Sequence, residues 1–102
     1  MSREVHDARI VQCGYEQKTV SSTVATLSSA QYQGATKAII QTSLDIRYML
    51  DHAAGGLTTS KGIKQTSTDP LLVIPAADFS KFGMIATGSD ATVEVMYVRE
   101  QA

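Results

Sequence analysis

The stretch that most constrains the fold of this chain runs from Thr36 to Asp51, with the sequence TKAIIQTSLDIRYMLD. In its second half, alternate positions are apolar and fall on one face: Ile46, Tyr48 and Leu50. Its first half alternates in the same way, with Ala38 and Ile40 on one face. A period of two is typical of a strand with one buried face. Two such runs separated by a few turn residues predict one hairpin of a β-sandwich.

A second alternating pattern lies between Phe79 and Arg99. It contains the run FGMIAT, the turn residues GSD and the run ATVEVMYV. We expect one face of the last run to be buried, the face with Ala91, Val93, Val95 and Tyr97. A short loop that contains glycine is a common connection between paired strands, so this stretch is predicted to form a second hairpin.

The segments between these patterns favour strands and loops over helices. Arg9 to Gly14 is a short β-prone run, and Lys18 to Gln33 is rich in Ser, Thr and β-branched residues. A brief strand is expected around Ile63. The run LLVI lies between Pro70 and Pro75, which limits it to a strand of about four residues, apolar enough for burial on both faces.

About six to eight short antiparallel strands, spaced at about ten residues, predict an all-β fold, a single small β-sandwich or jelly-roll-like domain. No segment requires a helix of three turns. At 102 residues the chain has the length of one domain with one core. The polar leader MSREVHDAR shows no periodicity. We therefore divide the chain into an extended N-terminal arm, residues 1–10, and a β-sandwich domain, residues 11–102.

The net charge of −1 argues against functions that depend on a strong electric field. It gives no long-range attraction to nucleic acid or to an anionic membrane, so neither is expected as a partner. The single cysteine, Cys13, forms no internal disulfide and is predicted to be a small buried side chain, which favours synthesis in a reducing compartment. The charged N-terminus and the lack of a run of about 18 apolar residues indicate a soluble protein without a secretory signal.

No set of residues in the sequence has the spacing of a catalytic or metal site. His6 and His52 are far apart and lack a neighbouring Cys or acidic ligand, unlike the local pairs typical of zinc sites. A Ser/His/Asp triad from Ser60, His52 and Asp69 lacks the sequence of a nucleophile elbow. The run GGLTTSK at 55–61 lacks the order of a phosphate-binding loop and is interpreted as a flexible surface loop. We therefore expect no enzyme activity, no cofactor and no metal.

Two residue types leave alternatives open. Several aspartates at predicted strand ends or turns can cap turns or gather around a calcium ion: Asp45, Asp51, Asp69, Asp78 and Asp90. The tyrosines can pack in the core and in interfaces, or form a face that stacks on sugars: Tyr15, Tyr32, Tyr48 and Tyr97. Turn capping and core packing are the more general roles, and we adopt them as the working interpretation.

Five motifs occur in a recognisable order: KAIIQ, DIRYMLD, LTTSKGI, LLVI and FGMIATGSDATVEVMYVRE. In this order they resemble a group of small tailed-phage virion proteins. The pattern of that group reads A-x-I-Q, then I-R-Y-x-x-D-G, then P-T-x-x-x-G, and finally an I-A-T-G turn before a V-x-Y-x-R strand. The resemblance covers about residues 24–99. The chain departs from the pattern at HAAGG, where a tighter Asp-Gly turn is usual, and at Leu57, where a Pro is usual.

Members of that group are similar to capsid decoration or cement proteins and to head or tail accessory proteins built from β-sandwich modules. The resemblance therefore implies a non-enzymatic structural protein of a tailed-phage virion, made in the cytoplasm of the bacterial host. The main expectation is a decoration or cement protein that binds and reinforces the major capsid shell. A head-tail or tail accessory component and a carbohydrate-binding β-sandwich module are the alternatives. The expected partners are the major capsid protein or other virion proteins.

Two segments are predicted to contact the partner. The first is the arm, Ser2 to Ile10, which can lie over a neighbouring subunit or complete its sheet, with the contact residues Ser2, Arg3, Glu4, Val5, His6, Asp7 and Arg9. The second is the loop His52 to Lys61, with the contact residues Leu57, Thr58 and Lys61. Apolar residues on nominally outer faces also lead us to expect a homo-oligomer, a dimer or trimer: Ile39, Met49 and Met96.

Overall fold

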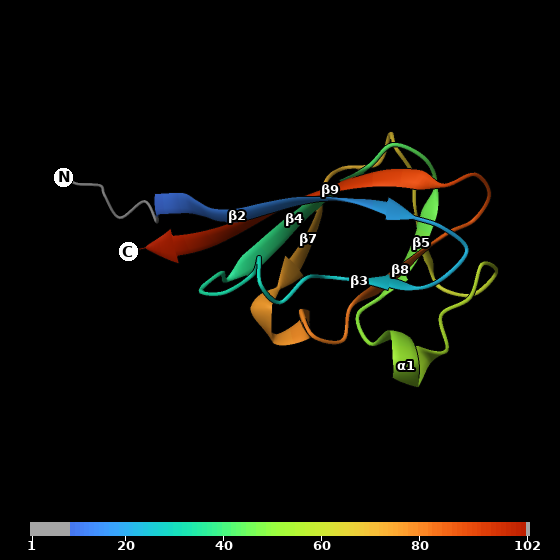
Figure 1. The fold of residues 1–102 in the computed structure, drawn as a ribbon, viewed down its shortest axis with the longest axis horizontal. Helices are drawn as coiled ribbons and strands as arrows, with labels where there is room; N and C mark the ends of the chain where they lie inside the picture. Colours follow the sequence, from blue (N-terminus) through green and yellow to red (C-terminus); the bar gives the residue numbers. More distant parts are fainter. Residues whose placement is uncertain (1–8, 102) are drawn as a thin grey trace.

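The computed structural model describes residues 9–101 as two antiparallel sheets of four strands each, packed face to face (Figure 1). The first sheet has the order β2 (Arg9–Val20), β9 (Ala91–Gln101), β4 (Lys37–Thr42) and β7 (Leu72–Pro75). The second has the order β3 (Ala25–Thr26), β8 (Gly83–Ala86), β5 (Ile46–Met49) and β6 (Ile63–Gln65). The predicted all-β sandwich is confirmed.

Two short helical turns interrupt the strands. The helix α1 (His52–Gly55) follows β5, and the 3-10 turn η1 (Ala76–Asp78) follows β7. Neither reaches three turns, as the sequence predicts. Within residues 9–101 no helix is long and apolar enough to cross a membrane.

The strands of both predicted hairpins exist, but their predicted pairing is wrong. β4 pairs with β7 and β9, whereas β5 pairs with β6 and β8, so the chain crosses from one sheet to the other between β4 and β5. β8 and β9 likewise lie in different sheets. A short polar loop can close a hairpin or arch between sheets. In the first connection, Ser43 donates its N–H to the Thr92 carbonyl of β9 at 2.9 Å before the chain turns into the second sheet.

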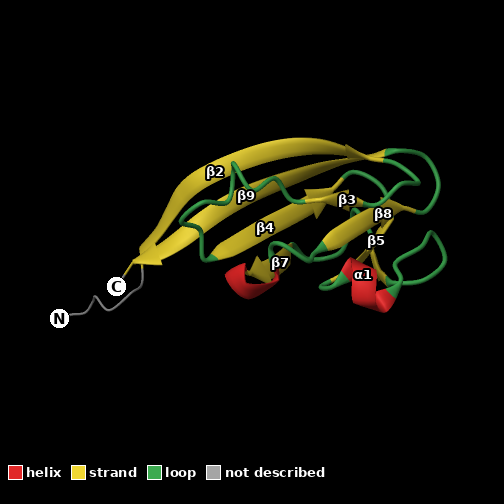
Figure 2. Ribbon diagram, turned by 60° about the horizontal axis from the view of Figure 1, so that its bottom comes forward, coloured by secondary structure: helices red, strands yellow, loops and turns green. Residues whose placement is uncertain are grey.

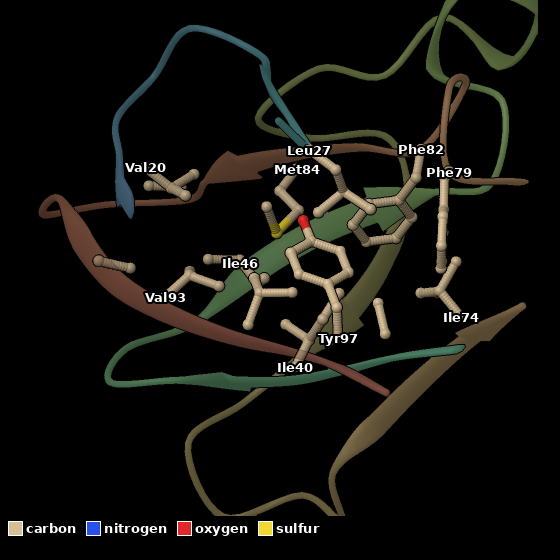
Figure 3. Packing of buried hydrophobic residues seen from close by; sticks show 14 residues of the cluster. Val20, Leu27, Ile40, Ile46, Ile74, Phe79, Phe82, Met84, Val93 and Tyr97 are labelled. Atoms are coloured by element: carbon tan, nitrogen blue, oxygen red, sulfur yellow. The ribbon is translucent and has the colours of Figure 1, made fainter. Parts of the chain in front are cut away.

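The core lies between the two sheets and is built from the faces that the alternation predicts (Figure 3). In β9 the predicted inner face has no exposed surface at all, with 0% for Ala91, Val93, Val95 and Tyr97. Ala38 and Ile40 of β4 are buried in the same way. Alternation therefore identifies the buried faces correctly, although it does not identify the strand partners.

The shorter strands depart from the predicted burial. Ile46 of β5 is buried, but Tyr48 is only half-buried, and Leu50 lies past the end of the strand and is exposed. In β7, Ile74 is buried while Val73 is exposed, so this strand is buried on one face and not on two. The reason is that a sandwich of two sheets covers only the inner face of each sheet, so the outer face of β7 stays open to solvent.

Strand β2 is longer than the β-prone run that predicts it. It extends from Arg9 to Val20 and pairs with β9 over this length, with Arg9 opposite Gln101 and Ile10 opposite Glu100. These two residues therefore belong to the sheet, and the arm boundary predicted at residue 10 is wrong. Pairing with β9 extends the strand past the run that local preference favours. Residues 2–8 of the predicted arm lie outside the described residues.

β2 and β9 together form a curved ribbon that extends past β4 at the end where Arg9 pairs with Gln101 (Figure 2). The register shifts between Gln12 and Gly14, which is a β-bulge at Cys13. Cys13 is half-buried against the core, with its Sγ 3.6 Å from the Tyr97 carbonyl oxygen. The bulge increases the local twist of the strand and so contributes to the curvature of the ribbon.

Candidate functional site

An open groove separates the two sheets along one side of the sandwich. It has a volume of about 730 Å³ and is lined by residues of β5, β6 and α1 on one side and of β7 and η1 on the other. Its lining is mainly apolar and includes Tyr48, Leu50, Ile63, Leu72 and Ile74. A groove of this size and character can accept an extended apolar segment.

The groove is open because it lies between two edge strands. Among residues 9–101, β6 ends the second sheet and β7 ends the first, so each of these strands is paired there on one side only. Ala76 donates its N–H to the Thr36 carbonyl at 2.9 Å, so its backbone groups point toward β4. Along an antiparallel strand, the direction of the backbone N–H and C=O groups reverses at each residue. Val73, three residues before Ala76, therefore directs its N–H and C=O away from β4. Pro75 has the same orientation, and its missing N–H leaves no gap in the sheet. The free edge of β7 therefore offers a partner strand the N–H and C=O of Val73 and the C=O of Pro75, fewer groups than a long regular edge strand offers.

Apolar side chains on inner strand faces remain exposed at the groove. Ile63 pairs with Tyr48 and lies on the inner face of the second sheet, yet it is 61% exposed. Leu50, just after β5, is 46% exposed. Single exposed apolar side chains are common on soluble proteins, but several beside a concave apolar surface indicate a site of interaction. The groove is therefore the candidate binding site.

Two carboxylates line the groove, those of Asp51 and Asp78, and Asp51 takes part in local structure. Asp51 caps α1 by accepting a hydrogen bond from the Ala54 N–H at 3.1 Å. Lys64 of β6 lies 3.6 Å from the Asp45 carboxylate, and both side chains are about half exposed, so this ion pair contributes little. We therefore expect the groove to bind through apolar contacts and backbone hydrogen bonds.

The predicted contact loop, His52 to Lys61, is more structured than the interpretation as a flexible loop allows. Its first residues form α1, which is capped at its C-terminal end by Gly56 with a positive φ of 69°. Leu57 is 7% exposed and packs inside the loop, so little of its surface is available for the predicted contact with a partner. Thr58 and Lys61 exchange backbone hydrogen bonds of 3.1 and 3.2 Å and form an exposed tip. This tip remains available to a partner.

The Arg47 side chain holds this loop in place. Its Nη1 donates to the Gly62 carbonyl at 2.8 Å, and its Nε donates to the Thr59 carbonyl at 3.2 Å. A Cβ at Gly62 would lie 2.6 Å from the Leu57 Cδ1 atom, which shows how closely the loop packs on itself. Burial of Leu57 follows from this packing, which the sequence pattern does not reveal.

The other predicted contact residues lie at the N-terminus. Arg9 is the first residue of β2 and pairs with Gln101, so its backbone is part of the sheet. The others lie outside the described residues: Ser2, Arg3, Glu4, Val5, His6 and Asp7.

The residues of the hypothetical triad have other roles. The Ser60 Oγ lies 3.4 Å from the Thr58 Oγ1, and Asp69 accepts the Thr66 N–H at 2.8 Å to close a turn. His52 begins α1, where its Cβ packs against Gly83 of β8. Among residues 9–101 no hydrogen bond connects the three triad side chains, and no group of three His, Cys, Asp or Glu side chains is placed to hold a metal ion.

The tyrosines do not gather on one face. Tyr97 is buried, and Tyr32 packs against it and against Phe79, with ring centroids 6.1 and 5.0 Å apart. Tyr48 packs against another aromatic ring of the core. Tyr15 is 48% exposed, on the outer side of β2. Core packing is therefore confirmed for three tyrosines, and the four together form no sugar-stacking face.

A polar cluster that is not among the sites predicted from the sequence lies on the opposite side of the sandwich, beside β2. Glu16 has the same parity in β2 as the buried Val20, so it points inward, and its side chain is 10% exposed. Its carboxylate accepts hydrogen bonds from the Tyr97 hydroxyl, from the Ser28 hydroxyl at 2.7 Å and from the Ser28 N–H at 3.1 Å. The Lys18 ammonium lies 3.2 Å from the same carboxylate. In the sequence, Glu16, Lys18 and Val20 occupy alternate positions, which predicts that their side chains lie on the same face of the strand.

Opposing effects set the pKa of Glu16. Burial by itself raises the pKa of this carboxyl, but the hydrogen bonds from Tyr97, Ser28 and Lys18 outweigh burial and hold the pKa below its usual value. Burial, and then the bonded Glu16 carboxylate, raise the pKa of the Tyr97 hydroxyl. Glu16 is therefore ionised and Tyr97 neutral at pH 7. Because the cluster connects β2 with the loop after β3, we assign it a structural role.

Comparison of the chain with models of known families, with curated proteins and with solved structures found no match. The surfaces described above and the order of the sequence motifs are therefore the basis for a functional proposal. Of these surfaces, the groove between β6 and β7 combines concave shape, apolar lining and unpaired strand edges.

Proposed function

We propose that this protein is a non-enzymatic structural component of a tailed-phage virion, a decoration or cement protein that binds the major capsid protein. The ordered motifs between residues 24 and 99 support the virion setting through their resemblance to small phage virion proteins. The open groove supports the mode of action, because it offers a surface for a partner segment.

The groove carries this proposal. Its occupant is an extended apolar segment of a neighbouring capsid subunit. Such a segment adds to the free edge of β7, where the Val73 N–H donates to a carbonyl of the segment and the Val73 C=O accepts from one of its N–H groups. Its alternate side chains then enter the groove and contact Leu50 and Ile63.

The expected affinity of one copy is modest, and the number of copies compensates for it. Burying the exposed parts of Leu50 and Ile63 contributes roughly 1 kcal/mol each. Backbone hydrogen bonds to β7 add about 1 kcal/mol each. A shell that carries many copies gains stability from every contact, and a subunit that bridges two neighbours binds more tightly than through either contact alone.

Co-sedimentation with capsid shells tests the proposal. Shells assembled from the major capsid protein of the phage genome that encodes this chain are mixed with the purified protein and pelleted. We expect binding at a fixed copy ratio, and Ile63→Glu should weaken it at least about tenfold because a carboxylate enters the apolar groove. Leu44→Glu is the control, since Leu44 is also an exposed apolar residue, at 46% against 61% for Ile63, but lies away from the groove. Lack of binding by the unaltered protein, or unchanged binding by Ile63→Glu, would contradict the proposal.

A deletion tests the proposed contact by the arm. Removing residues 2–8 leaves β2 complete, because this strand begins at Arg9. If the arm contacts the shell, the shortened protein no longer co-sediments, while its circular-dichroism spectrum stays that of a β-sandwich. Stoichiometric binding of the shortened protein would remove the arm from the account and leave the groove as the contact.

A further inference from the structure

The outer face of the first sheet carries an apolar row that crosses all four strands. Tyr15 of β2 is opposite Met96 of β9, Met96 is opposite Ile39 of β4, and Ile39 is opposite Val73 of β7. Tyr15 and Val73 are about half exposed, at 48% and 50%, and Ile39 and Met96 are partly exposed. The solvent face of an antiparallel sheet is usually polar. Four apolar side chains in register therefore indicate a face that is covered in an assembly.

The row forms part of a shallow hollow with polar edges. This hollow has a volume of about 280 Å³, and Tyr15, Ile39, Met96 and Leu71 line it together with polar residues such as Gln41 and Glu94. The Tyr15 hydroxyl donates to the Glu94 carboxylate at 3.3 Å, which joins one end of the row to its polar edge. An apolar centre with a polar rim is the usual arrangement of a protein–protein interface.

Charged residues of opposite sign flank the row on its two sides. Glu94 lies two residues before Met96 on the same face of β9, so it is on one side of the row. Lys37 is opposite Val98, which follows Met96, so it lies on the other side. Each is displaced from the row by about 7 Å along its strand. Lys37 also pairs with Glu100 at 3.0 Å, but its side chain remains 45% exposed.

We propose that two copies of this chain pack through this outer face, with a two-fold axis that runs along the apolar row. This axis places each residue of the row against the same residue of the second copy and reverses the strand direction. The Glu94 side of one copy then meets the Lys37 side of the other. Sheets packed face to face are about 10 Å apart, a distance that a Lys and a Glu side chain can span together.

The charges select this axis over its alternative. A two-fold axis parallel to the strands would bring Glu94 near the second Glu94 and Lys37 near the second Lys37. Like charges at an interface are unfavourable, so the face is complementary to itself only when the axis follows the row. The net charge of −1 gives two copies little mutual repulsion, which makes self-association compatible with the overall electrostatics.

The long free edge of β2 is a less suitable surface for a second copy. Its register shift at Cys13 and its inward-pointing Glu16 and Lys18 are features that discourage the addition of another strand. The dimer uses the sheet face and not the groove, so it does not depend on capsid binding. The two can therefore fail separately.

Analytical ultracentrifugation tests the dimer. The protein concentration should run from about 10 µM to 1 mM, because a contact through one face of a small sheet is expected to have low affinity. We expect a reversible monomer–dimer equilibrium for the unaltered protein. Met96→Glu should weaken it at least about tenfold, and Tyr15→Glu provides a second row variant with a more exposed side chain. Ile63→Glu, the same change in the groove, is the matched control and should leave the dimer intact. A protein that is monomeric at about 1 mM, or a dimer that Ile63→Glu disrupts and Met96→Glu does not, would overturn the proposal.

A charge exchange tests the direction of the axis. Lys37→Glu and Glu94→Lys should each weaken the dimer at least about threefold, because each places like charges across the interface. The double variant should recover the original affinity, since the two opposite charges have exchanged places. Glu100→Ala, which removes the partner of Lys37 within one copy, should leave the dimer unchanged. Single variants without effect, or a double variant that recovers nothing, would overturn the arrangement.

Discussion

The two sides of the sandwich, where the edges of the sheets face each other, differ in whether the gap between the sheets is covered. Beside β2 and β3, the loop from β3 to β4 covers the gap between the sheets: Leu27 is buried there, and Tyr32 packs against Phe79. The Ser28 hydrogen bonds to Glu16 attach this loop to β2. Beside β6 and β7, no segment of residues 9–101 covers the gap, and Ile63 of the inner face remains exposed.

The covered side depends on a close approach of two backbone segments at Gly14. A Cβ at this position would lie 2.2 Å from the Gln31 carbonyl oxygen, so a side chain there would push the loop away from β2. The chain therefore closes one gap with its own residues at close range and leaves the other open. This contrast is the structural reason for proposing the open groove as the partner site.

The largest expected effect is on the covered side, at Tyr97. Tyr97→Ala removes a large buried ring and the hydroxyl that binds Glu16, so we expect a loss of about 3–5 kcal/mol in the free energy of unfolding. Tyr97→Phe keeps the ring and leaves Glu16 without one donor, with a loss of about 1–3 kcal/mol. Urea denaturation measures both values. Equal stability of Tyr97→Phe and the unaltered protein would show that the hydrogen bond to Glu16 does not stabilise this side.

The next largest expected effect on stability is at Glu16, whose carboxylate is the acceptor of the cluster. Glu16→Ala leaves the Ser28 N–H, the Tyr97 hydroxyl and the Lys18 ammonium without their shared acceptor, and we expect a loss of about 2 kcal/mol. Glu94→Ala is the control on the outer face, where the carboxylate makes exposed hydrogen bonds, and should change stability by less than about 0.5 kcal/mol. Thermal denaturation of the two variants compares them directly. Similar losses in both would contradict a special role for Glu16.

The pKa of Glu16 predicts a dependence of stability on pH. Because its folded pKa is below the unfolded value of 4.5, the carboxylate contributes stability above that pH and loses this contribution as the pH falls through the folded pKa. Glu16→Gln should therefore show a flatter decline in the free energy of unfolding below about pH 4.5 than the unaltered protein does. Denaturant titrations at a series of pH values provide the test, with Glu94→Gln as the control. An identical acid decline in the unaltered protein and Glu16→Gln would contradict the prediction.

The smallest expected effect on stability is on the open side. Ile63→Ala removes an exposed side chain at the edge of the groove and should change the free energy of unfolding by less than about 0.5 kcal/mol. The same substitution should still weaken shell binding, since the groove loses an apolar contact. A large loss of stability, measured by urea denaturation, would show that Ile63 serves the core, and the contrast between the two sides would no longer hold.

Much of the fold could be predicted from the sequence, and the pairing of its strands could not. The alternation in β4, β5 and β9 follows from the geometry of an extended backbone, so it identified strands and inner faces without any knowledge of partners. The same alternation is compatible with a hairpin or with an arch between sheets. For this reason β4 and β5 were placed next to each other, although they lie in different sheets.

The candidate sites were less predictable for the same reason. Ile39 and Met96 were recognised as apolar residues on outer faces, but their alignment with Tyr15 and Val73 depends on the register of four strands. Leu57 was expected to be exposed because its neighbours are polar, and it is buried because Arg47 holds the loop closed over it. Glu16 and Ser28 meet through the fold of a loop that carries no signal of its own.

The all-β fold class, the single domain and the buried faces of the longer strands can all be read from the sequence, because they follow from local alternation and composition. The tertiary structure alone decided which strands are neighbours, which two become the edges of an open groove, and which outer residues align into a row. These features depend on contacts between segments far apart in the chain. Local backbone geometry leaves those contacts undetermined, and packing of the two sheets selects them.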